Sequence, residues 1–455
     1  ALALVGVVLA LRLAGLVDAS RTSHGPNLLL VSIDTLRADR LGAYGAAVPT
    51  SPEIDRRLAG EGVVFERCWS QSPKTTPSHM TLLTSLYPPV HGIELWEDTT
   101  PGAVLNPRVR TLADVLENAG YATAAFTGGA HVHRSRGFGQ GFDVYKHGQE
   151  LARALAWLDA HPRRKFFLFF HTYQVHDPYL PPEELIARFA PNADGPILAA
   201  VRRLRGGAGA GWEAGHRLFW AAVDPQSPGD TATVSRLYDA GIRHMDATTM
   251  APLLDRLDAL GLARDTLVVF LSDHGEAFAE HGRFLHDDLY GETLHVPLIL
   301  RFPGRLTRGT RVPEPVRLVD VMPTILDLLG VPGPPAMQGR SLAPLLRDAA
   351  ASRGDGVFSD YSNTRARRVF QSLRLGPLTY IVDGGREELF DTAGDPREQR
   401  NLSLERPAVL ADMRQRLGRA MSAWAPLAAR LGPHGAGVAP SDETMRQLRA
   451  LGYVE

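Results

Sequence analysis

Short apolar runs bounded by polar residues recur along the chain and define the pattern from which its fold is predicted. They show no polar–apolar alternation, so each predicts a strand that is buried on both faces of a sheet. The runs of this kind lie at residues 27–33, 122–126, 165–170, 266–271 and 296–302. Such strands are typical of parallel sheets that helices cover on both sides.

Segments with helical spacing of apolar residues lie between these runs. They occupy residues 54–59, 107–119, 151–158, 235–260 and 319–329. We expect Pro323 to interrupt the last of these helices, because proline lacks the N–H of a helix interior. Strands that alternate with helices predict an α/β fold with a doubly wound, mostly parallel sheet flanked by helices.

The pattern changes after about residue 353. Two short strands at residues 369–375 and 379–382 predict an antiparallel meander, and a helix follows at residues 408–427. We therefore expect a small C-terminal α+β subdomain. The predicted organisation is a catalytic domain at 27–350 with an insertion or lid at about 190–230, the subdomain at 351–434, and a linker with a terminal helix at 435–455.

The beginning of the chain bears on its cellular location. Residues 1–17 are almost wholly apolar, and a polar linker follows at residues 18–26. The apolar run is just short of a bilayer span, so it fits a truncated membrane anchor, a signal-peptide core or a buried helix. Because the polar linker follows at once, we expect export, with the protein periplasmic, extracellular or anchored to the membrane.

Polar side chains with metal-binding or acid–base chemistry follow several of the predicted strands. They are Asp34, His171 with His176, and Asp273 with His274. Ligands of α/β proteins bind at the carboxyl ends of parallel strands, so these groups should converge. An oxygen-rich set with one imidazole predicts one divalent cation, with Ca, Mg or Mn favoured and Zn also compatible.

The stretch from Lys74 to His79 predicts a helix N-terminus, because two threonines precede Pro77 and an apolar periodic segment follows. A helix N-terminus attracts an anion through its free N–H groups and its dipole. Thr75 is therefore a candidate nucleophile facing a phosphate or sulfate, with Lys74 behind it. Considered alone, the stretch is better explained as an ordinary helix cap.

The composition of the chain argues against nucleic-acid binding and against sites built from several cysteines. A net charge of −1 over 455 residues offers no basic stripe for nucleic acid, so no nucleic-acid partner is expected. Cys68 is the single cysteine of the chain, which excludes an internal disulfide and a cysteine-rich metal cluster.

Four stretches of the chain resemble the sulfatase family of the alkaline phosphatase superfamily. They are residues 27–39 (NLLLVSIDTLRAD), 75–88 (TTPSHMTLLTSLYP), 272–286 (SDHGEAFAEHGRFLH) and 289–303. The resemblance covers nearly the whole chain after Pro26, and Phe390-Asp391 with Asp395-Pro396 resembles the family's C-terminal part. It implies the same doubly wound sheet, a small C-terminal subdomain, and a metal bound beside a covalent nucleophile.

The resemblance also assigns roles by motif. The metal ligands it implies are Asp34, Thr75, Asp273 and His274. His176, in the motif His-Asp-Pro-Tyr, resembles the family's substrate-contacting histidine. His286 resembles a Lys or His that assists the leaving group. His131 and His133 are expected to be ordinary loop residues.

Several positions depart from the family pattern. Sulfatases carry a Cys or Ser, converted to formylglycine, where this chain has Thr75. The family's Arg is here His79, its second Asp is Thr35, and its Gly-Lys segment is Gly128-Gly129. Lys74 and His79 are therefore the residues expected to supply positive charge to a substrate anion. A Thr nucleophile resembles the phosphodiesterases and phosphotransferases of the same superfamily.

Three functions follow as hypotheses. The first is a metal-dependent hydrolase of sulfate or phosphate esters, with Thr75 forming a covalent intermediate. The second is a phosphotransferase or phosphodiesterase at the membrane surface that acts on a lipid or glycan. The third is an inactive sulfatase-like protein that binds anionic glycans, although a retained metal-binding set argues against it. The expected partners are small-molecule, lipid or glycan esters, with membrane association through the N-terminus.

Overall fold

The computed structural model describes residues 25–93, 103–161, 164–191, 193–207, 211–348, 351–352, 354, 356–362, 369–432 and 435. The apolar segment predicted at 1–17, nearly all of the linker at 18–26 and the terminal helix expected within 435–455 lie outside these residues. Within the described part, no helix is both long enough and apolar enough to cross a membrane.

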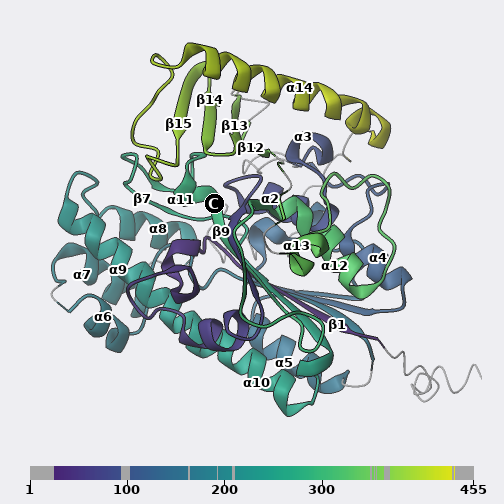
Figure 1. The fold of residues 1–455 in the computed structure, drawn as a ribbon. Coiled ribbons are helices and arrows are strands. Elements are labelled where there is room, and N and C mark those ends of the chain that lie inside the picture. The colour runs from purple at the N-terminus through teal and green to yellow at the C-terminus, as the bar shows by residue number, and fades with distance from the viewer. Residues whose placement is uncertain are drawn as a thin grey trace, which may run out of the picture.

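A nine-stranded sheet forms the centre of the molecule (Figure 1). Its strand order is β10-β2-β9-β6-β1-β5-β3-β4, with β11 beside β2. The strands are β1 (Asn27–Ile33), β2 (Val63–Trp69), β3 (Ala122–Thr127), β4 (Val144–His147), β5 (Phe166–Thr172), β6 (Thr266–Leu271), β9 (His295–Arg301), β10 (Thr310–Val312) and β11 (Val316–Arg317). Strand β9 runs antiparallel to β2 and β6, and the other pairings are parallel. The predicted mostly parallel α/β sheet is confirmed.

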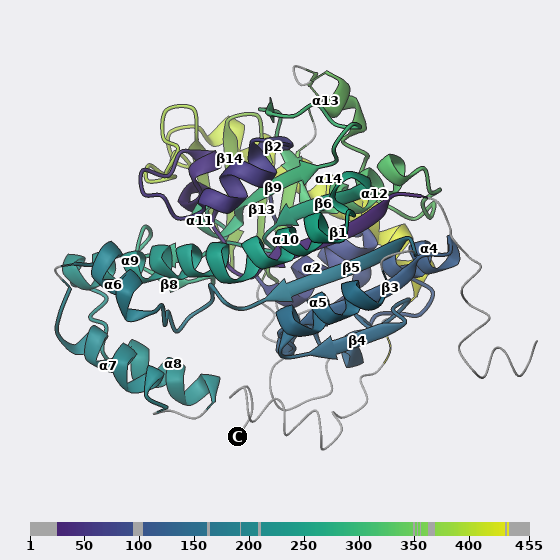
Figure 2. The ribbon, with the colours of Figure 1, turned by 90° about the horizontal axis from the view of Figure 1, so that it is seen from below.

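Helices cover both faces of the sheet, as the apolar runs predict (Figure 2). One face packs on α5 (Glu150–Ala160), α9 (Pro228–Met245) and α10 (Ala251–Ala259), and the other on α2 (Thr75–Thr84), α4 (Leu112–Asn118) and α12 (Val321–Leu329). Successive residues of β1 enter opposite cores: Leu28 and Leu30 enter one, Leu29 and Val31 the other. Burial on both faces is the reason why this strand shows no alternation.

One helix prediction is wrong. Pro323 does not interrupt the helix predicted at 319–329, because it lies in the first turn of α12, where no intrahelical N–H bond is lost. The helix predicted at 54–59 is confirmed, and it is a π-helix, η4 (Ile54–Ala59). The helix predicted at 235–260 is also confirmed. It begins earlier than expected, at Pro228, and runs from α9 through a π-helical turn at Asp246–Met250 into α10.

The segment predicted as an insertion folds into helices. It contains α7 (Pro196–Arg205) and α8 (Trp212–Trp220), which lie beside α6 (Glu183–Phe189) and α9 at one side of the sheet (Figures 1 and 2). These helices were not predicted, because the segment is rich in alanine, glycine and arginine. The buried residues Ile197, Val201 and Leu204 of α7 nevertheless have helical spacing.

A four-stranded antiparallel sheet forms the C-terminal part, with the long helix α14 (Pro407–Leu431) packed on it (Figure 1). Its strands are β12 (Val357–Asp360), β13 (Phe370–Leu375), β14 (Leu378–Asp383) and β15 (Arg386–Asp391). The predicted meander is confirmed and gains β12 and β15 at its edges.

Short elements in other parts of the chain include α3 (Pro88–His91), β7 (Ala277–Phe278), β8 (Phe284–Leu285), α11 (Gly291–Leu294) and α13 (Ala343–Arg347).

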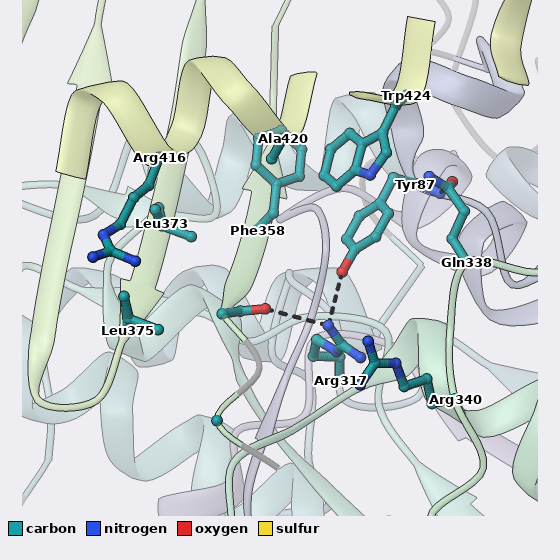
Figure 3. Close-up of a pocket in the computed structure, with 12 residues that line it drawn as sticks. Tyr87, Arg317, Gln338, Arg340, Phe358, Leu373, Leu375, Arg416, Ala420 and Trp424 are labelled. Carbon is teal, nitrogen blue, oxygen red and sulfur yellow. Dashed lines mark hydrogen bonds between the residues drawn. The ribbon is translucent and has the colours of Figure 1, made fainter. Parts of the chain in front are cut away.

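An aromatic contact holds α14 against the catalytic part beside a cavity of about 360 Å³ (Figure 3). The rings of Trp424 and Tyr87 stack with centroids 4.2 Å apart, and Phe358 meets Trp424 edge-on. Arg317 donates a hydrogen bond of 3.2 Å to the Tyr87 hydroxyl. These contacts fix the C-terminal subdomain next to the loop that follows α2.

A second contact joins the C-terminal subdomain to the loop between β7 and α11. His281 lies 2.6 Å from the Glu292 carboxylate and 3.0 Å from the Glu398 carbonyl oxygen. Its ring stacks on Tyr290 with centroids 3.5 Å apart. Burial alone would lower the pKa of His281, but Glu292 raises it to about 9.

This shift predicts a pH-dependent contribution to stability. The folded pKa of His281 lies above its unfolded value, so the stabilisation is complete below about pH 6.5 and is lost as pH rises through about 9. We expect His281→Gln to lower the thermal midpoint at pH 6 and to have a much smaller effect at pH 10. Glu292→Gln should abolish the pH dependence of that difference. A difference that stays constant across this range would contradict the prediction.

Candidate active site

Three buried ligands gather where β1 and β6 end. Asp34 follows β1, and Asp273 and His274 follow β6. The two strands pair in parallel, with Ser32 beside Leu271, so their carboxyl ends meet at one edge of the sheet. One ligand atom from each residue lies within 4.8 Å of the others, and all three side chains are buried.

The donor set fits a divalent cation. Asp34 Oδ1 and Asp273 Oδ2 are buried and accept no hydrogen bond. Two buried carboxylate oxygens that accept no hydrogen bond are costly, and a cation between them would remove the cost. Two carboxylates and one imidazole suit a hard or borderline metal, in agreement with the expected Ca, Mg, Mn or Zn. The metal identity stays a prediction.

The two carboxylates titrate as an interacting pair. Burial alone would raise the pKa of Asp34, but the hydrogen bond from His171 and the charge of His274 lower it. Burial and the charge of Asp34 raise the pKa of Asp273 well above its usual value. Without a cation the pair therefore favours a single negative charge, and a bound cation would allow both groups to ionise.

Thr75 lies against this cluster at the first position of α2. Its Oγ1 is 3.2 Å from Asp34 Oδ2 and 3.3 Å from His274 Nε2. The helix N-terminus predicted for this stretch is confirmed, because α2 begins at Thr75. The hydroxyl thus lies at the positive end of a helix and beside the predicted cation site, an arrangement that favours an oxyanion.

Lys74 and His286 border Thr75 on one side. The Lys74 ammonium forms an ion pair with Asp287 and lies 3.3 Å from His286 Nδ1. The His286 ring lies 4.4 Å from that of His274, and its Nδ1 is 3.0 Å from the Pro73 carbonyl oxygen. Burial and the charge of Lys74 hold the pKa of His286 well below its usual value, so the imidazole is neutral near pH 7.

His176 has the opposite charge state. Its Nδ1 lies 3.1 Å from Asp177 Oδ1, and its ring meets that of His286 at 5.7 Å. Burial alone would lower the pKa of His176, but Asp177 raises it to about 10. The site therefore places a protonated histidine, His176, beside a neutral one, His286. A protonated imidazole can act as a general acid and a neutral one as a general base.

His79 lies behind the group formed by Asp34, Asp273 and His274. It has no exposed surface, its Nε2 is 2.9 Å from Ser32 Oγ, and its Nδ1 is 2.9 Å from the Thr75 carbonyl oxygen. Burial lowers its pKa to about 3, so the ring is neutral. These contacts favour a supporting role for His79, and its predicted contact with substrate stays a prediction.

His131 follows β3 in a short turn, as predicted for a loop residue. Its carbonyl oxygen accepts a hydrogen bond from the Thr76 hydroxyl at 2.9 Å. Burial and the charge of Arg136 lower the pKa of its imidazole to about 3. The sequence did not indicate that this turn lies beside the start of α2, because that contact depends on the order of β3 and β5 in the sheet.

Comparison with known proteins points to one family. A sequence model of the family described as "Sulfatase" matches residues 26–331, and one for the C-terminal part of N-sulphoglucosamine sulphohydrolase matches residues 279–423. Arylsulfatase K of Mus musculus is 27% identical and covers 91% of this chain and 84% of its own. Delta 4,5-hexuronate-2-O-sulfatase of Bacteroides thetaiotaomicron is 25% identical, and the match covers 85% of this chain and 86% of that protein.

Solved structures share the fold. The structure of BT4656 in complex with its substrate D-glucosamine-2-N,6-O-disulfate has a TM-score of 0.70 at 20% identity, covering 89% of this chain and 99% of that one. Phosphonate monoester hydrolase of Agrobacterium radiobacter has a TM-score of 0.68 at 22% identity, and the match covers 88% of this chain and 95% of that one.

Proposed function

The chain belongs to the sulfatase family, whose members are sulfuric ester hydrolases, and on that premise we propose that it cleaves sulfate esters with Thr75 as nucleophile. The observation that carries the proposal is the position of the Thr75 hydroxyl, which lies at the N-terminus of α2 and within 3.3 Å of both Asp34 and His274. The relatives that act on sulfated sugars support a sulfated glycan or a small sulfate ester as substrate.

We assign the steps of the reaction to residues of this chain. A cation held by Asp34, Asp273 and His274 would supply positive charge that lowers the pKa of the Thr75 hydroxyl and neutralises the ester oxyanion. Thr75 releases its hydroxyl proton to solvent, its Oγ1 attacks the sulfur, and the bond from sulfur to the leaving oxygen breaks. His176, protonated by virtue of Asp177, donates a proton to that oxygen.

The second half of the reaction hydrolyses the covalent threonine ester. His286, which is neutral, accepts a proton from the attacking water. The N–H groups at the start of α2 and the Lys74 ammonium hold the transferred group. Water then replaces Thr75 on the sulfur, and His286 passes the proton to the departing Thr75 oxygen, which restores the hydroxyl. His176 regains its proton from solvent before another cycle.

A second candidate function is the cleavage of phosphodiesters or phosphonate monoesters. The observation that favours it is Thr75 itself, because the family's sulfatases use a Cys or Ser that is converted to formylglycine. The structural likeness to a phosphonate monoester hydrolase is consistent with this candidate. Export, metal identity and membrane association remain proposals that follow from the sequence alone.

Paired substrates test the two candidates. Lys74 is paired with Asp287, and His176 with Asp177, so with a divalent cation bound the ionised groups around Thr75 nearly balance. We therefore expect monoanionic aryl sulfates and aryl phosphodiesters to be cleaved in preference to dianionic phosphate monoesters. Faster cleavage of the phosphodiester than of the sulfate would favour the second candidate. No cleavage of any ester by the metal-loaded protein would refute both.

A further inference from the structure

The insertion helix α8 reaches the residue next to His176. His216 Nδ1 lies 2.5 Å from Asp177 Oδ2, and Trp220 donates its indole N–H to the same oxygen at 3.0 Å. The other carboxylate oxygen of Asp177, Oδ1, lies 3.1 Å from His176 Nδ1. One buried carboxylate therefore joins α8 to a histidine of the active site.

The position of Asp177 matters because it determines how the His176 ring is turned. His176 Nδ1 is engaged by Asp177, at 3.1 Å from the carboxylate and 2.9 Å from the backbone carbonyl oxygen. Any proton given to substrate must then come from Nε2. A carboxylate orients an imidazole well only if the carboxylate is itself held, as in the outer contacts of metal-bound histidines. His216 and Trp220 provide that hold from the insertion.

The same helix supports the other histidine of the site. Phe219 has no exposed surface and meets the Tyr179 ring edge-on at 5.7 Å, two residues after Asp177. Trp220 packs on Phe284 with centroids 5.1 Å apart, two residues before His286. Helix α8 thus contacts the loops that carry His176 and His286, which are far apart in sequence.

We propose that His216 is a positioning residue of the active site, which holds Asp177 from the side of α8 so that Asp177 orients His176 toward the substrate. The inference rests on the proposed function, in which His176 donates a proton to the leaving oxygen. The insertion is then a functional part of the site and not only a surface addition. His216 does not itself contact the reacting atoms.

Three variants test the role of His216. His216→Ala removes the Nδ1 contact, whereas His216→Asn places an amide N–H close to the same position. Arg217→Ala is the matched control, because Arg217 lies on the same helix, is 64% exposed and pairs with Glu213. We expect His216→Ala to lower kcat about tenfold with little change in KM, because partial loss of general acid catalysis acts on the chemical step. His216→Asn should restore most of the activity, and Arg217→Ala should behave as the wild type.

A double-variant comparison separates positioning from a general structural role. If His216 acts through His176, His216→Ala should cost about tenfold in the wild-type background and almost nothing beside His176→Ala. An equal loss in both backgrounds, or a fall in thermal midpoint that accounts for the loss, would overturn the inference.

A spectroscopic readout keeps this inference distinct from the proposed function. In metal-loaded protein with ¹⁵N-labelled histidine, the ring-nitrogen signals of His176 are assigned from their loss in His176→Ala. We expect them to shift in His216→Ala and to stay in place in His216→Asn and Arg217→Ala. Unchanged signals in His216→Ala would overturn the inference, whether or not an ester is cleaved. Absence of turnover with the expected shifts would refute the proposed function alone.

Discussion

Thr75→Ala should lower kcat on the best aryl ester by roughly 10³-fold or more, because it removes the atom that forms the covalent bond. Thr75 is almost fully buried at the start of α2, and its hydroxyl contacts Asp34 and His274, which belong to the candidate metal site and not to the apolar core. The thermal midpoint of the variant should therefore stay close to that of the wild type. The measurement is steady-state turnover with saturating metal, alongside a thermal melt.

Two neighbouring substitutions serve as controls. Thr75→Ser keeps a hydroxyl at the same place and should retain measurable activity. Thr76→Ala removes the adjacent hydroxyl, which bonds to the His131 carbonyl oxygen and to Arg136 and does not face the cluster ligands. It should cost far less than Thr75→Ala.

A covalent adduct gives a direct check on the nucleophile. Acid quenching during turnover should leave a sulfated or phosphorylated peptide that contains Thr75, detected by mass spectrometry. Activity of Thr75→Ala equal to that of the wild type would show that another group attacks the ester.

Asp273→Ala should lower the affinity for the divalent cation by at least about 100-fold and abolish turnover at ordinary metal concentrations. Asp273 and Asp34 each supply one buried carboxylate oxygen to the candidate metal site that accepts no hydrogen bond. The wild type should gain about 2.7 kcal/mol of stability at a metal concentration 100 times its Kd, and the variant should gain almost nothing. Elemental analysis and thermal melts with and without metal measure both effects.

Comparing the stability of Asp273→Ala with that of the wild type, both without metal, is the stricter test of the cation site. Without a cation, the burial of Asp273 and its repulsion with Asp34 are unfavourable, as the raised pKa of Asp273 indicates. Asp273→Ala should then be as stable as the metal-free wild type or more stable. Asp114→Ala is a contrasting control, because Asp114 caps α4 through Thr111 and its loss should destabilise the protein with or without metal. A strong loss of stability in metal-free Asp273→Ala would argue against a cation site.

The apolar runs predicted the core of the fold well, because burial on both faces leaves a direct mark on the sequence. They could not predict the direction of β9, since a buried antiparallel strand carries the same apolar composition as a parallel one. The helices of the insertion escaped prediction because their alanine, glycine and arginine content obscured the helical spacing of their apolar residues, which belong to the same core as one face of the sheet. Pro323 was misjudged because its effect depends on its position within the helix, which is set by where α12 begins.

The candidate metal site was predictable because its proposed ligands directly follow strands in the sequence. Asp34, Asp273 and His274 need only the parallel pairing of β1 and β6 to meet, and that pairing follows from the fold class. The contact between the His131 backbone and Thr76 was not predictable, because it depends on the place of β3 beside β5 in the sheet.

By itself, the sequence determined the α/β class, the strand-end ligands and the threonine at the start of α2, because each of these depends on residues close together in the chain. The tertiary structure alone decided the charge states of the histidines and the contact of α8 with Asp177. His176 is protonated and His286 is neutral because of burial and of which charges lie beside them. His216 and Asp177 are 39 positions apart, and only the packing of the insertion brings their side chains together.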